Sequence, residues 1–301
     1  MIEIKNISKS FDGFAAVTDL SLNIKGGQVF GMIGTNGAGK STVLRMMSGV
    51  LKQDAGEILV DGEPVFEHPS VKRSFYFIAD EPYFFGTGNP GDMEDYAAHI
   101  YPDFDREGFE KLLATFELDP KRKISTFSKG MKKQLSILLG LSTNTKYLYL
   151  DETFDGLDPV MRQGVKALFA AEIDKRGLTP IIASHNLREL EDICDTVGLL
   201  HKGGVLLEKD LEELKESVQK LQAVFSEEDA AMEIKGKLNI IKEECRGRLR
   251  TWTVRGNREE TERIVREAAP IYYELLPLTL EEIFISETEV IGYDVKRLIL
   301  E

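Results

Sequence analysis

The sequence predicts an α/β fold followed by a smaller α+β domain, and three observations support this. An apolar run, Val29 to Ile33, leads into the glycine-rich stretch GTNGAGKST and then into the helical pattern STVLRMMSGV. Two later apolar runs, KYLYLDE (146–152) and IIASHN (181–186), are typical of buried strands that end in polar residues. Beyond residue 210 the pattern changes to short strand-like and helix-like segments.

The glycine-rich stretch matches a phosphate-binding loop, in which Gly34 and four further residues precede Gly39-Lys40-Ser41. Glycines let successive backbone N–H groups point into one hollow, and the helix that follows adds the positive end of its dipole. Lys40 would reach the outer phosphates, and the Ser41 hydroxyl would ligate Mg²⁺. The loop residues predicted to bind nucleotide are Gly34, Thr35, Asn36, Gly37, Ala38, Gly39, Lys40, Ser41 and Thr42.

Composition narrows the class of protein. The 301 residues are 42% hydrophobic, enough for a core, and no apolar run approaches the ~18 residues of a membrane span. The first residues, MIEIKNISKSFDGF, lack the apolar core of a signal peptide. The chain has only two cysteines, as suits a reducing compartment. Both observations predict a cytoplasmic protein. The net charge of −13 argues against nucleic acid as a partner. A local basic stretch, residues 121–133, is either a solvated helix start or a face offered to phosphates.

The run KYLYLDE predicts a strand that ends in two carboxylates. If this strand lies parallel to the strand before the glycine loop, it brings Asp151 beside Ser41. Asp151 would then hold Mg²⁺ through water, and Glu152 would point at the attacking water as general base.

Three more segments specify the family. FSKGM (127–131) precedes a helical pattern, FDGLDP (154–159) follows Glu152, and IIASHN ends in Ser184 and His185. The order of these motifs after the phosphate-binding loop resembles that of ABC-type ATPases over residues 1 to about 210. Within that group the chain is similar to ATP-binding subunits of bacterial ABC-2-type exporters in the acetoin-utilisation and bacitracin-resistance branch. The resemblance implies a mixed-sheet core with an antiparallel β subdomain and a helical subdomain at about 80–140.

The resemblance also implies nucleotide contacts outside the loop. Phe11 matches the aromatic that stacks on adenine, although it could instead belong to the core of the first hairpin. Ser128 and Gly130 match the signature that binds the γ-phosphate held by the opposite subunit. The remaining nucleotide-site residues implied are Val17 and Asp158, the latter on the loop that crosses the dimer interface.

For catalysis the resemblance implies Glu152 as base, His185 as a γ-phosphate contact, and Ser41, Asp80 and Asp151 as Mg²⁺ ligands. Asp80 stands where the family has glutamine or glutamate, and its shorter side chain would reach the metal directly or through water. Other departures from the family pattern are Thr35 in the loop, Lys129 and Met131 in the signature, and Thr153 to Asp155.

These roles imply ATP and Mg²⁺ as cofactors and a homodimer or heterodimer of ATPase subunits with ATP between them. The function implied is to power a transporter through a separate integral membrane permease, from the cytoplasmic face of the membrane. A soluble ATPase serving a non-transport assembly is the alternative. A DNA-acting relative would need a long coiled-coil insert, but only 87 residues separate Lys40 from Ser128.

The predicted domains are the ATPase domain at 1–210, a linker helix at 211–222 and an accessory α+β domain at 223–301. Nine aromatic residues gather between 75 and 104, and they are either core of the helical subdomain or a groove for the permease. They are Phe75, Tyr76, Phe77, Tyr83, Phe84, Phe85, Tyr96, Tyr101 and Phe104.

Overall fold

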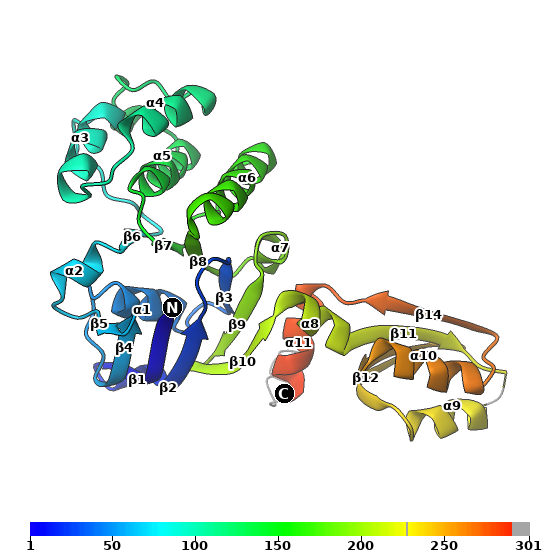
Figure 1. The fold of residues 1–301 in the computed structure, drawn as a ribbon. Helices are drawn as coiled ribbons and strands as arrows, with labels where there is room; N and C mark the ends of the chain where they lie inside the picture. Colours follow the sequence, from blue (N-terminus) through cyan, green and yellow to red (C-terminus); the bar gives the residue numbers. More distant parts are fainter. Residues whose placement is uncertain (227, 291–301) are drawn as a thin grey trace. The chain divides into compact units, whose positions relative to one another are not determined.

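The computed structural model describes residues 1–226 and 228–290, and the chain divides into two compact units, Met1–Glu208 and Lys209–Glu301 (Figure 1). The division lies beside residue 210, where the sequence predicts the end of the larger domain. Each unit has its own hydrophobic core. Among the described helices, none is long and apolar enough to cross a bilayer.

A six-stranded sheet with the order β10-β9-β3-β8-β7-β6 forms the centre of the first unit. Within it β3 pairs in parallel with β8 and β9, and β7 pairs in parallel with β8 and β6. Every residue of β3, β7 and β8 is buried, which is why these strands read as continuous apolar runs. The strands of the first unit are β1 (Ile2–Phe11), β2 (Phe14–Ile24), β3 (Phe30–Gly34), β4 (Ala55–Val60), β5 (Glu63–Pro64), β6 (Phe75–Ile78), β7 (Tyr147–Asp151), β8 (Thr179–Ser184), β9 (Thr196–His201) and β10 (Gly204–Asp210).

An antiparallel sheet with the order β2-β1-β4-β5 packs beside the central sheet. In its register Ile2 lies opposite both Ile24 and Val60. The apolar faces of β1 and β2 belong to the same core cluster as Phe30 and Met32 of the central sheet. The two sheets therefore enclose one core, and the predicted antiparallel subdomain is confirmed.

Side-chain caps begin the helices α3 to α6 of the first unit. Asn89 and Asp92 form a capping box around the first turn of the helix that starts at Pro90, and Asp158 caps the helix that starts at Pro159. The helices are α1 (Lys40–Met47), α2 (Pro69–Lys72), α3 (Pro90–Ile100), α4 (Arg106–Thr115), the 3₁₀ turn η1 (Ile124–Thr126), α5 (Lys129–Ser142), α6 (Pro159–Arg176) and α7 (Leu187–Glu191).

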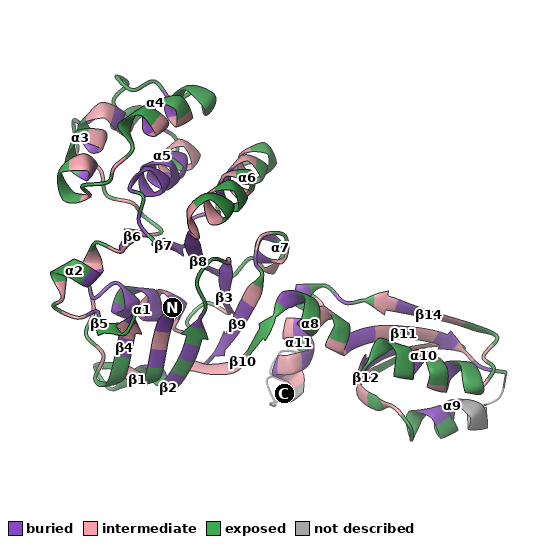
Figure 2. Cartoon of the chain, viewed as in Figure 1, coloured by how far each residue is buried: buried purple, intermediate pink, exposed green. Residues whose placement is uncertain are grey.

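A helical subdomain forms where α3, α4 and α5 pack on one another (Figure 1). Of these helices α5 is the most deeply buried, since every residue from Lys133 to Ser142 is buried (Figure 2). Its first residue follows Ser128, so the predicted signature lies at the N-terminus of a helix that is anchored in the core.

The second unit is an α+β fold with an antiparallel sheet of order β12-β13-β11-β14. Leu221 and Trp252 point into a core that α9 and α10 complete, and the neighbouring Lys220 and Thr251 line the other face beside α11. The elements are α8 (Leu211–Ser217), β11 (Val218–Val224), α9 (Glu228–Lys235), β12 (Asn239–Arg246), β13 (Leu249–Arg255), α10 (Arg258–Glu267), β14 (Tyr272–Pro277) and α11 (Leu280–Val290). Along the chain, the elements from β11 to β14 follow the βαββαβ order of ferredoxin-like domains, with α8 before them and α11 after them.

The predicted linker helix at 211–222 is wrong in its second half. The helix α8 ends at Ser217, and residues 218–224 form the strand β11. This strand pairs with both β13 and β14, and it is therefore central to the sheet. The hydrogen bonds to two partner strands outweigh the local helical pattern of LEELKESVQKLQ.

Candidate active site

The phosphate-binding loop connects β3 to α1 and owes its shape to close backbone contacts. Gly39 has a φ of +101°, and a Cβ at this position would lie 2.8 Å from the carbonyl oxygen of Ala16. Only glycine fits both conditions. Val17, which the sequence predicts to contact nucleotide, is buried, and its side chain packs against Gly39 of the loop.

The other loop residues differ in exposure. Gly34 and Ala38 are buried, Thr35 and Thr42 are half-buried, and Asn36 and Gly37 are exposed at the tip. The amide of Ala38 donates to the carbonyl of Thr35 at 3.0 Å, which closes the turn. The exposed tip of the loop thus consists of Asn36 and Gly37.

Lys40 is folded back into the loop. Its side chain is 5% exposed, and its Nζ donates to the carbonyl oxygens of Gly34 at 2.8 Å and Thr35 at 3.3 Å. The Glu152 carboxylate lies 3.6 Å from the same ammonium. Burial lowers the pKa of Lys40, and the charge of Glu152 opposes that shift. The ammonium is therefore held inside the curve of the loop, beside the ends of β3 and β7.

Asp151 meets Ser41 at the edge of the central sheet. The Ser41 hydroxyl donates to Asp151 Oδ1 at 2.8 Å, and Asp151 is 2% exposed. Burial raises the pKa of Asp151, while the hydrogen bond from Ser41 lowers it. A hydroxyl and a carboxylate are the hard oxygen ligands that Mg²⁺ prefers, so this pair fits the ion. The described residues hold no cluster of three or more His, Cys, Asp or Glu side chains arranged for a metal, and Mg²⁺ shared with phosphates needs none.

Glu152 follows Asp151 at once and stands in a left-handed conformation, with a φ of +47° that is uncommon outside glycine. Its amide donates to the carbonyl of Ala183 at 2.9 Å. Its Oε2 lies 2.8 Å from Nδ1 of His185 and accepts from the His185 amide at 3.3 Å. His185 is half-exposed, so its ring is open to a ligand at the sheet edge. Glu152 thus lies between Lys40 and His185, as a base acting beside a phosphate would need to.

Asp80 lies two residues after β6, and its carboxylate is 52% exposed. Its Oδ1 accepts from Nζ of Lys133 at 2.9 Å, and the same ammonium donates to the main-chain carbonyl of Glu152. The prediction from the sequence did not include Lys133. Lys133 stands between Lys132 and Gln134, before the apolar run that begins at Leu135, so the local sequence does not distinguish it from a solvated lysine.

The signature residues Ser128 and Gly130 do not lie among the side chains that surround the phosphate-binding loop. Ser128 is exposed and caps α5, its hydroxyl accepting from the Met131 amide at 3.2 Å. A Cβ at Gly130 would lie 2.9 Å from the carbonyl oxygen of Gly156, so the signature packs against the loop before α6. Lys129 and Asp155 form an exposed ion pair at 3.1 Å across the same contact. Asp158 caps α6 through the Met161 amide at 2.9 Å.

Phe11 ends β1 and is 44% exposed, with Lys9 Nζ 5.6 Å from the centre of its ring. It is therefore not core of the first hairpin, the alternative considered from the sequence. An exposed ring at a hairpin end is available for stacking.

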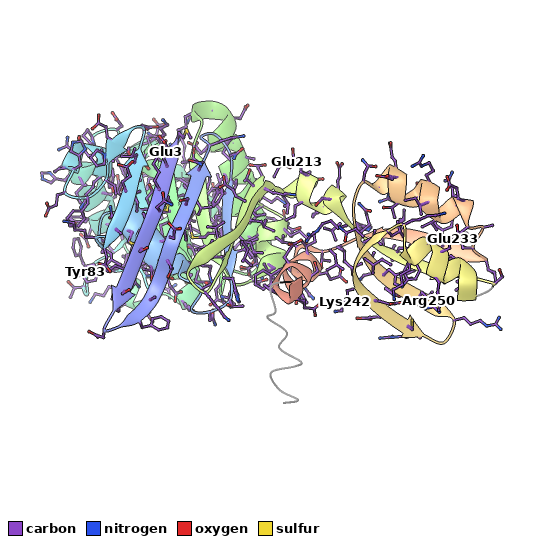
Figure 3. The ribbon with its side chains drawn as sticks, turned by 90° about the horizontal axis from the view of Figure 1, so that it is seen from below. Glu3, Tyr83, Glu213, Glu233, Lys242 and Arg250 are labelled. Carbon is purple, nitrogen blue, oxygen red and sulfur yellow. The ribbon has the colours of Figure 1, made fainter. Side chains whose placement is uncertain are left out.

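The aromatic cluster divides into two groups. Phe75 is buried and stacks on Tyr149, while Tyr101 packs against Tyr76 and donates to the Phe75 carbonyl. Tyr83, Phe85 and Tyr96 instead form a patch of edge-to-face contacts, which we call the aromatic patch. In it Tyr83 is 80% exposed and lies at the outside of the first unit (Figure 3). The cluster thus supplies both core and surface.

Taken together, the strand-loop-helix, the carboxylates at the next strand ends and the helical subdomain define an ATP-hydrolysing P-loop domain. The family model described as ABC transporter matches residues 17–155. The ABC transporter ATP-binding protein YtrB of Bacillus subtilis (strain 168) is 34% identical over 95% of this chain and 98% of its own length. The bacitracin transport ATP-binding protein BcrA of Bacillus licheniformis is 30% identical over 77% of each chain. A solved ATP-binding subunit of an ABC transporter superposes with a TM-score of 0.66 at 25% identity, covering 71% of this chain and 92% of that chain.

The chain belongs to the family of ABC transporter ATP-binding proteins, which confirms the resemblance drawn from the motifs. It is an ABC-type ATPase and the nucleotide-binding subunit of a transporter. A solved relative, cbiO1 from Clostridium perfringens, is described as part of the ABC transporter complex cbiONQ; it is 26% identical and superposes with a TM-score of 0.61 over 71% of this chain and 89% of that chain.

Proposed function

We propose that this chain hydrolyses ATP in a head-to-tail dimer, either with a second copy or with a homologous subunit. The observation that carries the proposal is the separation of two half-sites. Lys40, Asp151 and Glu152 converge at one sheet edge, while Ser128 is exposed at the N-terminus of α5. Among the described residues no hydrogen bond joins Ser128 to the phosphate-binding loop. A helix N-terminus attracts anions, so the signature of one subunit completes the site of the other.

Each residue of the composite site has a separate role in binding or hydrolysing ATP. Lys40 and the loop amides bind the phosphates, while Ser41 and Asp151 hold Mg²⁺, with Asp80 as a further ligand directly or through water. Mg²⁺, when bound, offsets the charge that develops on the phosphates. Glu152 takes a proton from the attacking water, and His185 holds that carboxylate while facing the γ-phosphate. Phe11 and Val17 lie on the adenine side, and Asp158 of the partner closes the interface.

We also propose that the chain works at the cytoplasmic face of a membrane, bound to an integral permease that selects the substrate. The aromatic patch is the proposed contact, because tyrosines combine a large apolar surface with a polar tip. The membrane-bound partner would place a helix against the exposed rings of Tyr83 and Tyr96.

Mixing two inactive chains tests the composite site. Ser128→Arg blocks the signature and Lys40→Ala disables the loop, so each homodimer lacks both of its sites. A heterodimer of the two keeps one intact loop facing one intact signature. We expect phosphate release to return to a measurable fraction of the wild-type rate, up to about a quarter of it in an equimolar mixture, because about half of the dimers are heterodimers and each has one of its two sites intact. No recovery at any ratio, with both chains folded by circular dichroism, would argue against action across the dimer.

Replacing the two exposed tyrosines tests the permease contact. The double variant Tyr83→Ser/Tyr96→Ser should keep the ATPase rate of the isolated chain, because neither side chain touches the site residues described above. Its recovery with the permease from solubilised membranes should fall by about tenfold or more, as expected when aromatic anchors are removed. Tyr272→Ser, at an exposed tyrosine of the second unit, is the matched control. Equal recovery of both variants contradicts the assignment of the patch.

A further inference from the structure

Lys133 is a buried cation that connects three segments around the site. Its side chain is 1% exposed, and its ammonium contacts Asp80 Oδ1 and the main-chain carbonyl of Glu152. An ammonium loses much of its hydration energy on burial, so these two partners are what keeps it there. Since Lys133 belongs to α5, one charge joins the helix of the signature, the segment after β6 and the turn after β7.

The contact with Glu152 bears on where its carboxylate points. Glu152 has a left-handed backbone, which costs free energy for a residue with a side chain. Its amide is held by the carbonyl of Ala183, and its carbonyl is held by Lys133. Because the peptide groups on both sides of its Cα are hydrogen-bonded, the backbone of Glu152 is fixed and so is the direction of its Cα–Cβ bond. From this position the carboxylate reaches His185 and Lys40.

We infer that Lys133 is a positioning residue for Glu152, and that Asp80 governs this role through its ion pair with Lys133. The inference rests on the proposed role of Glu152 as general base. Lys133 does not touch the reacting atoms; it holds the backbone that carries the base. Asp80 precedes the aromatic patch by three residues, so a displacement of that segment reaches Glu152 through two bonds, Asp80 to Lys133 and Lys133 to the Glu152 carbonyl.

Substitution of Lys133 tests the inference. Lys133→Met keeps most of the length and volume of the side chain and removes the charge and the donor. Loss of alignment at a reacting group costs on the order of 10²-fold, so we expect kcat to fall by about 10–100-fold. The Kd for a fluorescent ATP analogue should stay within about twofold, because Lys133 does not contact the phosphate-binding loop. Lys133→Gln keeps an N–H donor for the carbonyl and should fall between Met and wild type.

A matched control separates this effect from the loss of any lysine in an ion pair. Lys111 pairs with Glu107 on the surface of α4, where both side chains are more than 70% exposed. Such pairs contribute little. Lys111→Met should therefore retain the wild-type kcat.

A double-mutant cycle tests the part assigned to Asp80. Asp80→Asn should lower kcat in the wild-type background and lower it less in the Lys133→Met background, with non-additivity of about fivefold or more, because the part of its effect that passes through the ion pair is already lost there. An effect of Asp80 on Mg²⁺ is the same in both backgrounds and cancels in the cycle. A purely structural lysine predicts independent losses and equal effects on ATP affinity and kcat. That outcome, or a kcat of Lys133→Met within about twofold of wild type, overturns the inference.

Two further measurements separate a folding defect, and a failure of the proposed base, from a failure of the positioning role. If Lys133→Met does not fold by circular dichroism, Lys133→Leu, which also removes the donor and the charge, takes its place, and a wild-type kcat in that variant overturns the inference. Glu152→Gln is assayed alongside. Normal hydrolysis by Glu152→Gln refutes the proposed base itself, whereas an inactive Glu152→Gln with an unaffected Lys133 variant refutes only the positioning role.

Discussion

Glu152→Gln binds ATP and hydrolyses it about 10²–10⁴-fold more slowly than the wild type, the loss expected when a general base is removed. The amide has the shape of the carboxylate and can still meet His185, but it cannot accept a proton from water. The ion pair with Lys40, whose ammonium lies 3.6 Å from the carboxylate, is also lost, so the lysine remains available to phosphate. ATP should therefore hold the variant as a dimer that does not release its nucleotide.

Phosphate release and gel filtration with and without ATP measure this result. Glu110→Gln is the matched control, because Glu110 is exposed on α4 and has no described contact with the site. We expect that control to hydrolyse ATP normally. A Glu152→Gln chain that stays monomeric in saturating ATP and turns over at the wild-type rate would remove Glu152 from the mechanism.

Lys40→Ala abolishes nucleotide binding at concentrations where the wild type is saturated. The loop loses the ammonium that is held against the carbonyls of Gly34 and Thr35, inside the curve of the loop where phosphates would bind. Two charge-assisted hydrogen bonds at ~1.5–3 kcal/mol each correspond to a loss of affinity of at least about 10²-fold.

A fluorescent ATP analogue reports the affinity, and two further variants show whether the loss of affinity comes from the missing charge. Lys40→Met fills nearly the same volume as lysine without the charge, so it should bind as poorly as Lys40→Ala. Lys111→Ala removes a lysine from the surface and should leave the affinity unchanged. If Lys40→Met binds as well as wild type, the ammonium is not the phosphate ligand, and any defect of Lys40→Ala arises from the cavity.

Local sequence was sufficient for the parts of the site that depend on chain neighbours. The spacing from Gly34 to Ser41 requires a tight loop between strand and helix, and the structure has β3 and α1 on either side of it. The contact between Ser41 and Asp151 was also predictable, because parallel strands end at the same edge of a sheet. The caps of α5 and α6, Ser128 and Asp158, are likewise local signals.

The partners of side chains outside the recognised motifs could not be predicted from the sequence. Lys133 finds Asp80 and the Glu152 carbonyl at separations of 53 and 19 residues, and no local pattern specifies which partners a buried lysine meets. The aromatic residues between 75 and 104 have the same composition whether they pack inward, as Phe75 does, or outward, as Tyr83 does.

The sequence by itself determined the glycine loop, the apolar strands, the acidic strand end and hence the family, because each depends on a few adjacent residues. Tertiary structure alone decided three things: the partners of Lys133, the exposure of the aromatic patch and the end of α8 at Ser217. In the last case residues 218–222 have a helical pattern, yet they form β11 because two neighbouring strands offer hydrogen bonds on both sides. Local propensities differ by less than about 1 kcal/mol per residue, so pairing with two strands and burial of the sheet face determine the outcome.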